Sequence, residues 1–227
     1  MRPRALCNKV NEFFERGLEE GIFLAIQPHL LRGVIGSEIL EPPSNIGMLT
    51  AGGVSVREYI ELLDADRYSA VFDDHALLMV QCMFEGNAIR NHRYGYIPCP
   101  IKPQLMAERP EEISIADWVR SVISSSGVES FLSLGTYRFD FTKRLPSKST
   151  DPHPASHFTF ASAGCRLPVR APMSIGHLLN FLFDNFYRSH RSFWNDFAPH
   201  LAGGDVVDTI TAQEQLTHHI TWTDSPY

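Results

Sequence analysis

Apolar side chains recur at helical spacing in four parts of the chain, which predicts four amphipathic helices. The first spans about residues 6–18, and the other three begin at Ser55, Ser114 and Ser174. A serine directly before an apolar stripe is typical of a helix start, because its hydroxyl accepts a hydrogen bond from the first turn. A shorter helix is expected at 192–197.

Between the helices, apolar and polar residues alternate with a period of two, which predicts β-strands. The alternating segments lie at 70–72, 77–84, 89–97, 131–142, 157–161 and 165–169, with shorter extended pieces between 22 and 50. The first three form a meander, since only short turns separate them. Pro168 has no N–H to donate, which predicts that the last strand is an edge strand or a short one. Because the strands come in hairpins, we expect an α+β fold with an antiparallel sheet packed by amphipathic helices.

The length of 227 residues suits a single α+β domain over the whole chain. A proline-rich stretch near 98–110 is the best internal boundary, but a weak one. With 44% apolar and 20% charged residues, the composition is that of a folded globular protein and excludes a fibrous or disordered one. No apolar run approaches the length of a membrane span, and Glu12 and Glu15 interrupt the segment where a signal peptide needs an apolar core. We therefore expect a cytoplasmic protein without a membrane partner.

Charge is distributed unevenly along the second half of the chain. Residues 143–191 contain seven Lys or Arg and two acids, a net charge of +5, whereas residues 192–227 contain five acids and no Lys or Arg. In one interpretation, the acidic tail at 205–227 simply packs beside the basic region. In the other, the basic region binds phosphate and the tail competes for it. The formal charge of the whole chain is −6, which argues against a general affinity for polyanions.

The familiar catalytic motifs are absent: the sequence has no phosphate-binding P-loop, dinucleotide-binding glycine motif, nucleophile elbow or HExxH zinc motif. One constellation remains, in which Arg138 and Asp140 lie in one predicted strand and His157 begins the next, with His153 in the loop between them. Side chains alternate along a strand, so Arg138 and Asp140 share the face opposite their aromatic neighbours. If the two strands pair, His157 joins them on the polar face. The aromatic side chains then line the buried face, under the helix that begins at Ser174: Tyr137, Phe139, Phe141, Phe158 and Phe160.

This constellation suits acid–base chemistry on an anionic group. Asp140 would hold the imidazole of His157 by a ring N–H. Arg138 would bind the anion, and His153 would reach over the same face. Basic residues nearby in the sequence are candidates for binding phosphate or nucleic acid: Lys143, Arg144, Lys148 and Arg166.

Two other interpretations of these residues stay open. An Asp–His pair also commonly pins a strand to a loop, which is a purely structural role. Two histidines and an aspartate also suit zinc or manganese, so a divalent metal remains an alternative, although we assign none. The neighbouring pair His92 and Arg93 supplies a further basic group or forms part of a solvated strand face.

The same residues resemble a bacterial family of unknown function, DUF2290. The likeness is carried by His-Arg-Tyr-Gly-Tyr-Ile-Pro-Cys-Pro at 92–100, Arg-Phe-Asp at 138–140, His-Pro-Ala-Ser-His at 153–157, Cys-Arg-Leu-Pro-Val at 165–169 and Asn-Phe-Tyr at 185–187. The family has no established activity, so the resemblance implies no particular chemistry. The Arg-x-Asp plus His pattern is also similar, more distantly, to small bacterial toxins that are paired with antitoxins. Those toxins often carry a further histidine two places after the second one, where this chain has Thr159.

Two hypotheses about function follow. In the first, the chain is an enzyme, or a degenerate one, that acts on nucleic-acid phosphodiesters as a toxin-like or phage-defence component, with histidine as general acid or base. In the second, it is a non-catalytic subunit that docks nucleic acid or an acidic protein through residues 143–191, in a homo-oligomer or a hetero-complex. The second hypothesis needs only surface charge and an exposed apolar patch. The best candidate is the aromatic segment 181–194, with Phe183, Tyr187, Phe193 and Trp194.

Overall fold

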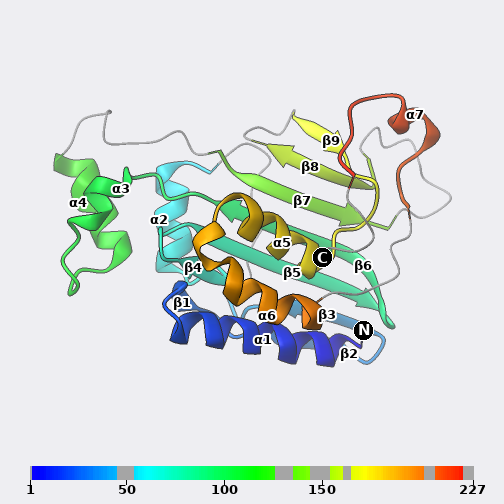
Figure 1. The fold of residues 1–227 in the computed structure, drawn as a ribbon, viewed down its shortest axis with the longest axis horizontal. Coiled ribbons are helices and arrows are strands. Elements are labelled where there is room, and N and C mark those ends of the chain that lie inside the picture. The colour runs from blue at the N-terminus through cyan, green and yellow to red at the C-terminus, as the bar shows by residue number, and fades with distance from the viewer. Residues whose placement is uncertain are drawn as a thin grey trace.

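An antiparallel sheet lies at the centre of the structure, a computed structural model that describes residues 2–44, 54–125, 135–143, 154–160, 165–201 and 208–221 (Figure 1). The strands within these residues are β1 (Phe23–Ile26), β2 (Leu30–Val34), β3 (Ser37–Glu41), β4 (Ala70–Phe72), β5 (Leu77–Glu85), β6 (Ala88–Ile97), β7 (Tyr137–Thr142), β8 (Ser156–Phe160) and β9 (Arg166–Pro168). Their order across the sheet is β1-β4-β5-β6-β7-β8-β9, and the hairpin of β2 and β3 joins β5 through β3. All these pairs are antiparallel, which confirms the expected α+β class.

The strand predictions that position the polar constellation are confirmed. Strands β4, β5 and β6 form the expected meander. Strands β7 and β8 pair with Asp140 directly opposite His157. Among the named strands, β9 lies at the end of the order, as its proline predicted.

The helices of the described residues are α1 (Pro3–Glu19), α2 (Val56–Asp64), α3 (Pro103–Ala107), α4 (Ile115–Ser125), α5 (Ile175–Asn185), α6 (Arg191–Leu201) and α7 (Ala212–Gln215), with a 3-10 turn, η2, at Arg188–His190. The three predicted serine caps are present, since the hydroxyls of Ser55, Ser114 and Ser174 each accept a backbone N–H three residues ahead. Helix α3 was not predicted; it begins at Pro103, a residue whose fixed φ suits the first helical position. No helix in these segments combines the length and the apolar character that crossing a membrane requires.

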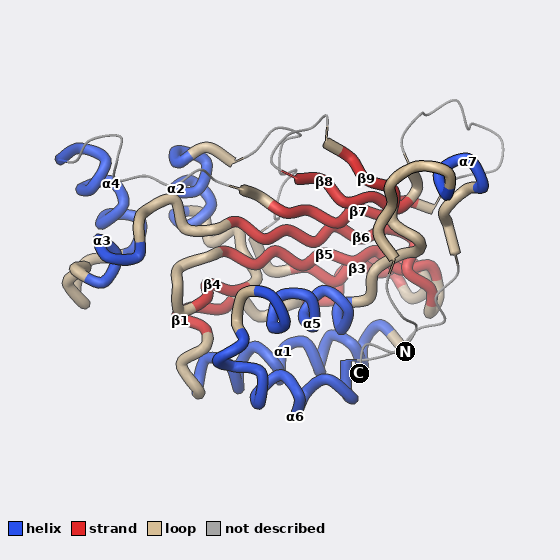
Figure 2. Tube along the Cα trace, turned by 45° about the horizontal axis from the view of Figure 1, so that its top comes forward, coloured by secondary structure: helices blue, strands red, loops and turns tan. Residues whose placement is uncertain are grey.

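The two faces of the sheet carry separate apolar cores. Figures 1 and 2 show α1, α5 and α6 lying together across one face, whereas α2, α3 and α4 gather at one end of the molecule. The split follows the alternation along β5, where Leu78 and Val80 belong to the first core and Leu77 and Met79 to the second. The second core also takes buried residues from α2, α3 and α4, so it covers only the part of its face near these helices.

The expectation of an exposed aromatic patch at 181–194 is wrong. Phe183, Tyr187, Phe193 and Trp194 are all buried. The reason is a second aromatic layer from α1: the ring of Phe13 lies 5.4–6.2 Å from those of Phe183, Phe193 and Trp194. The apolar stripe of α5 alone could not bury all four side chains. They are buried because α1 and α6 also pack against them.

The aromatic face of the β7–β8 hairpin is buried only in part. Phe139 and Phe141 are buried as expected, and the ring of Phe181 in α5 lies 5.7 Å from that of Phe139. Phe160, however, is 39% exposed. The register that places Phe139 opposite Phe158 is as predicted. The exposure of Phe160 therefore reflects how far the helices extend over this face, and not the pairing of the strands.

Two buried histidines link the stability of this core to pH. Burial lowers the pKa of His29 to about 4 and that of His92 to about 3, so both rings are neutral in the folded protein. The unfolded chain binds these protons near pH 6.5. The stability that the two neutral rings contribute is therefore fully present above pH 6.5. The free energy of unfolding then decreases as the pH falls from 6.5 towards the folded-state pKa values.

We expect His92→Gln to reduce the slope of the free energy of unfolding against pH by about 1.4 kcal/mol per pH unit between about pH 4 and pH 6. A glutamine carbonyl can still accept the N–H of Met173, which His92 Nε2 accepts at 3.0 Å. Urea denaturation at a series of pH values measures the slope. The exposed His200, changed to Gln, is the control and should leave it unaltered; an unaltered slope in His92→Gln would contradict the prediction.

Candidate functional site

Polar side chains replace apolar ones on the sheet face opposite α1, α5 and α6, beyond the part that the second core covers. One row of them crosses four strands, because the register places Gln81 opposite Arg93, Arg93 opposite Asp140 and Asp140 opposite His157. We call this the Asp140 row. Opposed residues in an antiparallel sheet lie on the same face with side chains in reach of one another. The pairing thus gathers charged groups from segments about 50 residues apart in the sequence.

A second row lies beside the first, two residues along each strand. Gly95 is opposite Arg138, Arg138 is opposite Thr159, and Thr159 is opposite Arg166. We call this the Thr159 row, and the two rows together the polar face. Residues two apart on a strand share a face, so Arg138 joins Asp140, and Thr159 joins His157.

Asp140 is the centre of the ion pairs on this face. Arg93 Nε donates to Oδ1 at 3.2 Å, and Arg138 Nε donates to Oδ2 at 2.5 Å. The side chains of Arg138 and Asp140 are each only 11% exposed. Two guanidinium groups thus share one largely buried carboxylate. The attraction between these ions compensates for the hydration that each of them loses on burial.

Thr159 lies between two cations and lacks a bond of its own. Its residue is 6% exposed, and within the described structure its buried hydroxyl has no hydrogen-bond partner. The register places Arg138 on one side of it and Arg166 on the other. A buried hydroxyl without a partner lowers stability by about 1–3 kcal/mol. It is therefore a position where a bound oxygen acceptor would supply a missing bond.

His157 is held as a neutral base beside these groups. Burial lowers its pKa, Asp140 and the Pro154 carbonyl act in the opposite direction, and Arg166 and Arg138 lower it further. The neutral ring donates from Nδ1 to the Pro154 carbonyl oxygen at 3.1 Å. The lone pair is then on Nε2, which lies 3.5 Å from Asp140 Oδ2. At that distance Asp140 acts on the ring through its charge, since both its oxygens already accept bonds from arginine.

The structure brings together four of the residues that the sequence analysis selected: Arg138, Asp140, His157 and Arg166. Lys143 lies just after β7 and forms an exposed ion pair with Glu85 at 2.7 Å, so its charge is already neutralised. Arg144, Lys148 and His153 lie outside the described residues.

Arg93 belongs to the site although no role was assigned to it. The sequence left two interpretations open for His92 and Arg93. Because side chains alternate along β6, His92 is buried in the core and Arg93 faces Asp140 on the other side of the sheet. At the other end of the Asp140 row, Gln81 donates to Glu41 Oε2 at 2.7 Å. Glu41 also pairs with Arg32, so this end of the row is neutral.

The described residues do not contain a cluster of three His, Cys, Asp or Glu side chains that could hold a metal ion. The metal interpretation joined Asp140 and His157 to His153, and only the first two lie in this part of the chain. Its donor set therefore remains untested.

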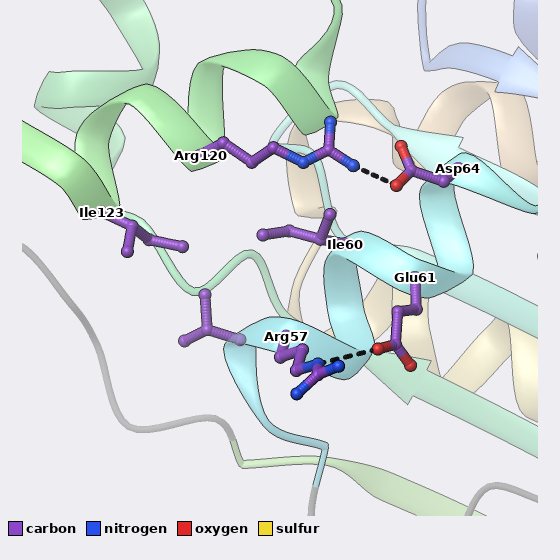
Figure 3. A pocket seen from close by; sticks show the side chains of 7 residues that line it. Arg57, Ile60, Glu61, Asp64, Arg120 and Ile123 are labelled. Atoms are coloured by element: carbon purple, nitrogen blue, oxygen red, sulfur yellow. Dashed lines mark hydrogen bonds and ion pairs between the residues drawn. The ribbon is translucent and has the colours of Figure 1, made fainter.

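A groove of about 580 Å³ lies elsewhere, between α2 and α4 (Figure 3). Its floor is apolar, and its two arginines are paired with acids: Arg57 with Glu61, and Arg120 with Asp64. The lining contains neither His nor Cys: Val56, Arg57, Ile60, Glu61, Asp64, Arg120 and Ile123. With its charges matched and no acid–base group present, this groove is a weaker candidate for chemistry than the polar face.

Comparison with known families places the chain among proteins whose activity is not described. The family model described as "Uncharacterized conserved protein (DUF2290)" matches residues 42–222, which include both rows of the polar face. No curated protein matches the chain, and no solved structure does. The resemblance expected from 92–100, 138–140 and 153–157 is confirmed. The chain belongs to the DUF2290 family of uncharacterized conserved proteins.

Proposed function

We propose that the polar face binds phosphate groups of nucleic acid, and that His157 acts there as a general base in cleavage of a phosphodiester. The observation that carries this proposal is the hydroxyl of Thr159, which is buried between Arg138 and Arg166 and has no hydrogen-bond partner among the described residues. A phosphate oxygen at this position accepts the Thr159 O–H and lies beside two guanidinium groups. An apolar ligand would leave the same hydroxyl unsatisfied.

The charge of the face favours an anion. Its described residues include three arginines, at 93, 138 and 166, and one aspartate. Guanidinium groups present several N–H donors in a plane, which matches the oxygens of phosphate. Because the face is largely buried, charge–charge attraction here is screened less than it would be at an exposed surface.

His157 supplies the acid–base function. With its lone pair on Nε2, the neutral ring removes the proton from a water or hydroxyl nucleophile as that oxygen forms its bond to phosphorus. The bond from phosphorus to the leaving oxygen then breaks, and that oxygen takes up a proton. Arg138 and Arg166 stabilise the extra negative charge on the phosphoryl oxygens in the transition state.

This chemistry fits the toxin-like or phage-defence role expected from the sequence, and that cellular role stays a prediction. The alternative, a non-catalytic partner subunit, rests on the basic region 143–191 and on an exposed aromatic patch at 181–194. Phe183, Tyr187, Phe193 and Trp194 of that patch are buried in the core, so the alternative keeps only its charge-based support.

We expect Thr159→Val to weaken binding of a fluorescein-labelled single-stranded oligonucleotide by about 10- to 100-fold, the effect of losing one hydrogen bond to a charged group. Valine has the shape of threonine and removes an unsatisfied hydroxyl, so the free protein should be as stable as before or more stable. Fluorescence anisotropy and thermal denaturation measure the two effects. Thr142→Val, at an exposed threonine of the neighbouring strand β7, is the control; equal affinities for the two variants would contradict the proposal.

We expect His157→Gln to abolish cleavage of the oligonucleotide while changing its affinity by less than about threefold, because the arginines and Thr159 are still present. In the wild type, kcat/KM should fall only at a pH below 6.5, since the base has a lowered pKa and must be deprotonated to act. Initial rates across pH measure this. Cleavage that survives His157→Gln, or an acid limb above pH 6.5, would rule out this base.

We expect Asp140→Asn to reduce the free energy of unfolding by about 3–5 kcal/mol, because it leaves two largely buried guanidinium groups without their shared carboxylate. Asp64→Asn, at the exposed pair with Arg120, is the matched control and should change it by less than about 1 kcal/mol. Chemical denaturation measures both. Adding Arg93→Gln to Asp140→Asn should recover part of the loss; equal effects of the two single variants would show that Asp140 does not organise the face.

A further inference from the structure

The described part of the acidic tail, residues 208–221, lies along the end of β9. Ile220 N donates to the Pro168 carbonyl oxygen at 2.9 Å, and Arg170 N donates to the Ile220 carbonyl oxygen at 2.9 Å. Thr209 N donates to the Arg170 carbonyl oxygen at 2.8 Å. Figure 1 shows α7, which belongs to this segment, beside the ends of β8 and β9. The tail therefore continues the sheet at the edge nearest the polar face.

Two side-chain contacts accompany these backbone bonds. Arg170 Nε donates to Asp208 Oδ1 at 2.8 Å, and the hydroxyls of Ser156 and Thr209 lie 2.7 Å apart. Ser156 is the neighbour of His157 in β8, and its carbonyl oxygen accepts the N–H of Val169 at 2.9 Å. A carboxylate of the tail thus occupies Arg170. A hydroxyl of the tail occupies Ser156, whose side chain lies on the face of β8 opposite to that of His157.

The segment is weakly held. None of the side chains from 208 to 221 is buried, and Leu216 is 80% exposed. The ion pair itself is half exposed on the side of Asp208. A pair of this kind contributes about 0–1 kcal/mol, so another anion can replace the carboxylate at little cost.

We propose that Arg170 forms a second phosphate-binding subsite at the end of β9, and that Asp208 occupies it in the free protein in place of a phosphate. This inference rests on the proposed function, because it treats nucleic acid as the ligand that displaces the tail. A carboxylate and a phosphate accept the same N–H groups of a guanidinium, and phosphate carries more charge and more oxygens. The nucleic-acid backbone bound along the polar face would then continue over the end of β9 to Arg170.

The test compares Asp208→Asn with Glu112→Gln. Both changes remove one negative charge from an exposed residue, but Glu112 lies in the loop before α4, in a different part of the fold. We expect Asp208→Asn to tighten binding of a labelled single-stranded oligonucleotide by about 3- to 10-fold at 50 mM salt, and Glu112→Gln to change it by less than twofold. A point change is preferable to deletion of the tail, which would also uncover the edge of β9.

The double variant gives the decisive comparison. Arg170→Gln should weaken binding and reduce the slope of log affinity against log salt by about one, the effect of losing one phosphate contact. In that background Asp208→Asn should have no further effect, because its carboxylate no longer competes for the guanidinium. Equal effects of Asp208→Asn and Glu112→Gln would overturn the inference, as would an Asp208→Asn effect that persists without Arg170.

The same measurements separate this inference from the proposed function. If Thr159→Val weakens binding as expected but Asp208→Asn behaves like Glu112→Gln, the tail does not occupy a phosphate subsite and the polar face still binds nucleic acid. If Thr159→Val and Arg170→Gln both leave the affinity unchanged, the proposed function and this inference fall together. Thermal denaturation of each variant shows that any change in affinity belongs to a folded protein.

Discussion

The register of β6, β7 and β8 is the constraint on which both the core and the candidate site depend. Side chains alternate along β7, so Phe139 packs under α5 and Asp140 faces Arg93 and His157 across the neighbouring strands. A shift by one residue would exchange these two sets, with phenylalanine among the arginines and aspartate in the aromatic core. The burial of the aromatic face therefore also sets the geometry of the polar face.

Asp140 makes that polar face compatible with a folded sheet. Three arginines on one face, in β6, β7 and β9, would repel one another, and like charges that lie close together on a sheet are destabilising. The shared carboxylate compensates Arg93 and Arg138 and fixes the direction of both guanidinium groups. It also influences His157, whose pKa is lowered by burial in spite of this nearby negative charge. One buried ion network thus fixes the shape of the face, whereas burial keeps the pKa of His157 low against the charge of Asp140.

The parts of the fold that were predictable from sequence are those in which neighbours along the chain decide the outcome. Ser55 and Ser174 cap helices through residues three positions away, and the β7–β8 hairpin follows from alternation across a short interval. Arg93 could not be assigned in this way, because its partner Asp140 is 47 residues distant and their strands pair only in the tertiary structure. The same reason explains Trp194, whose burial depends on α1 at the opposite end of the sequence.

At Thr159, the side chain that would be best for stability differs from the one that the proposed function requires. Almost every buried polar group in a folded protein has a hydrogen-bond partner, and an apolar side chain of similar shape would fill this position without a penalty. Instead, a hydroxyl without a partner among the described residues lies between Arg138 and Arg166. Violations of a local folding rule are expected where a protein binds or reacts, because the missing partner is then the ligand. Under the proposed function, an oxygen-rich anion would complete the hydrogen bonding of Thr159 and add negative charge next to the arginines, so one ligand would account for both features of the face.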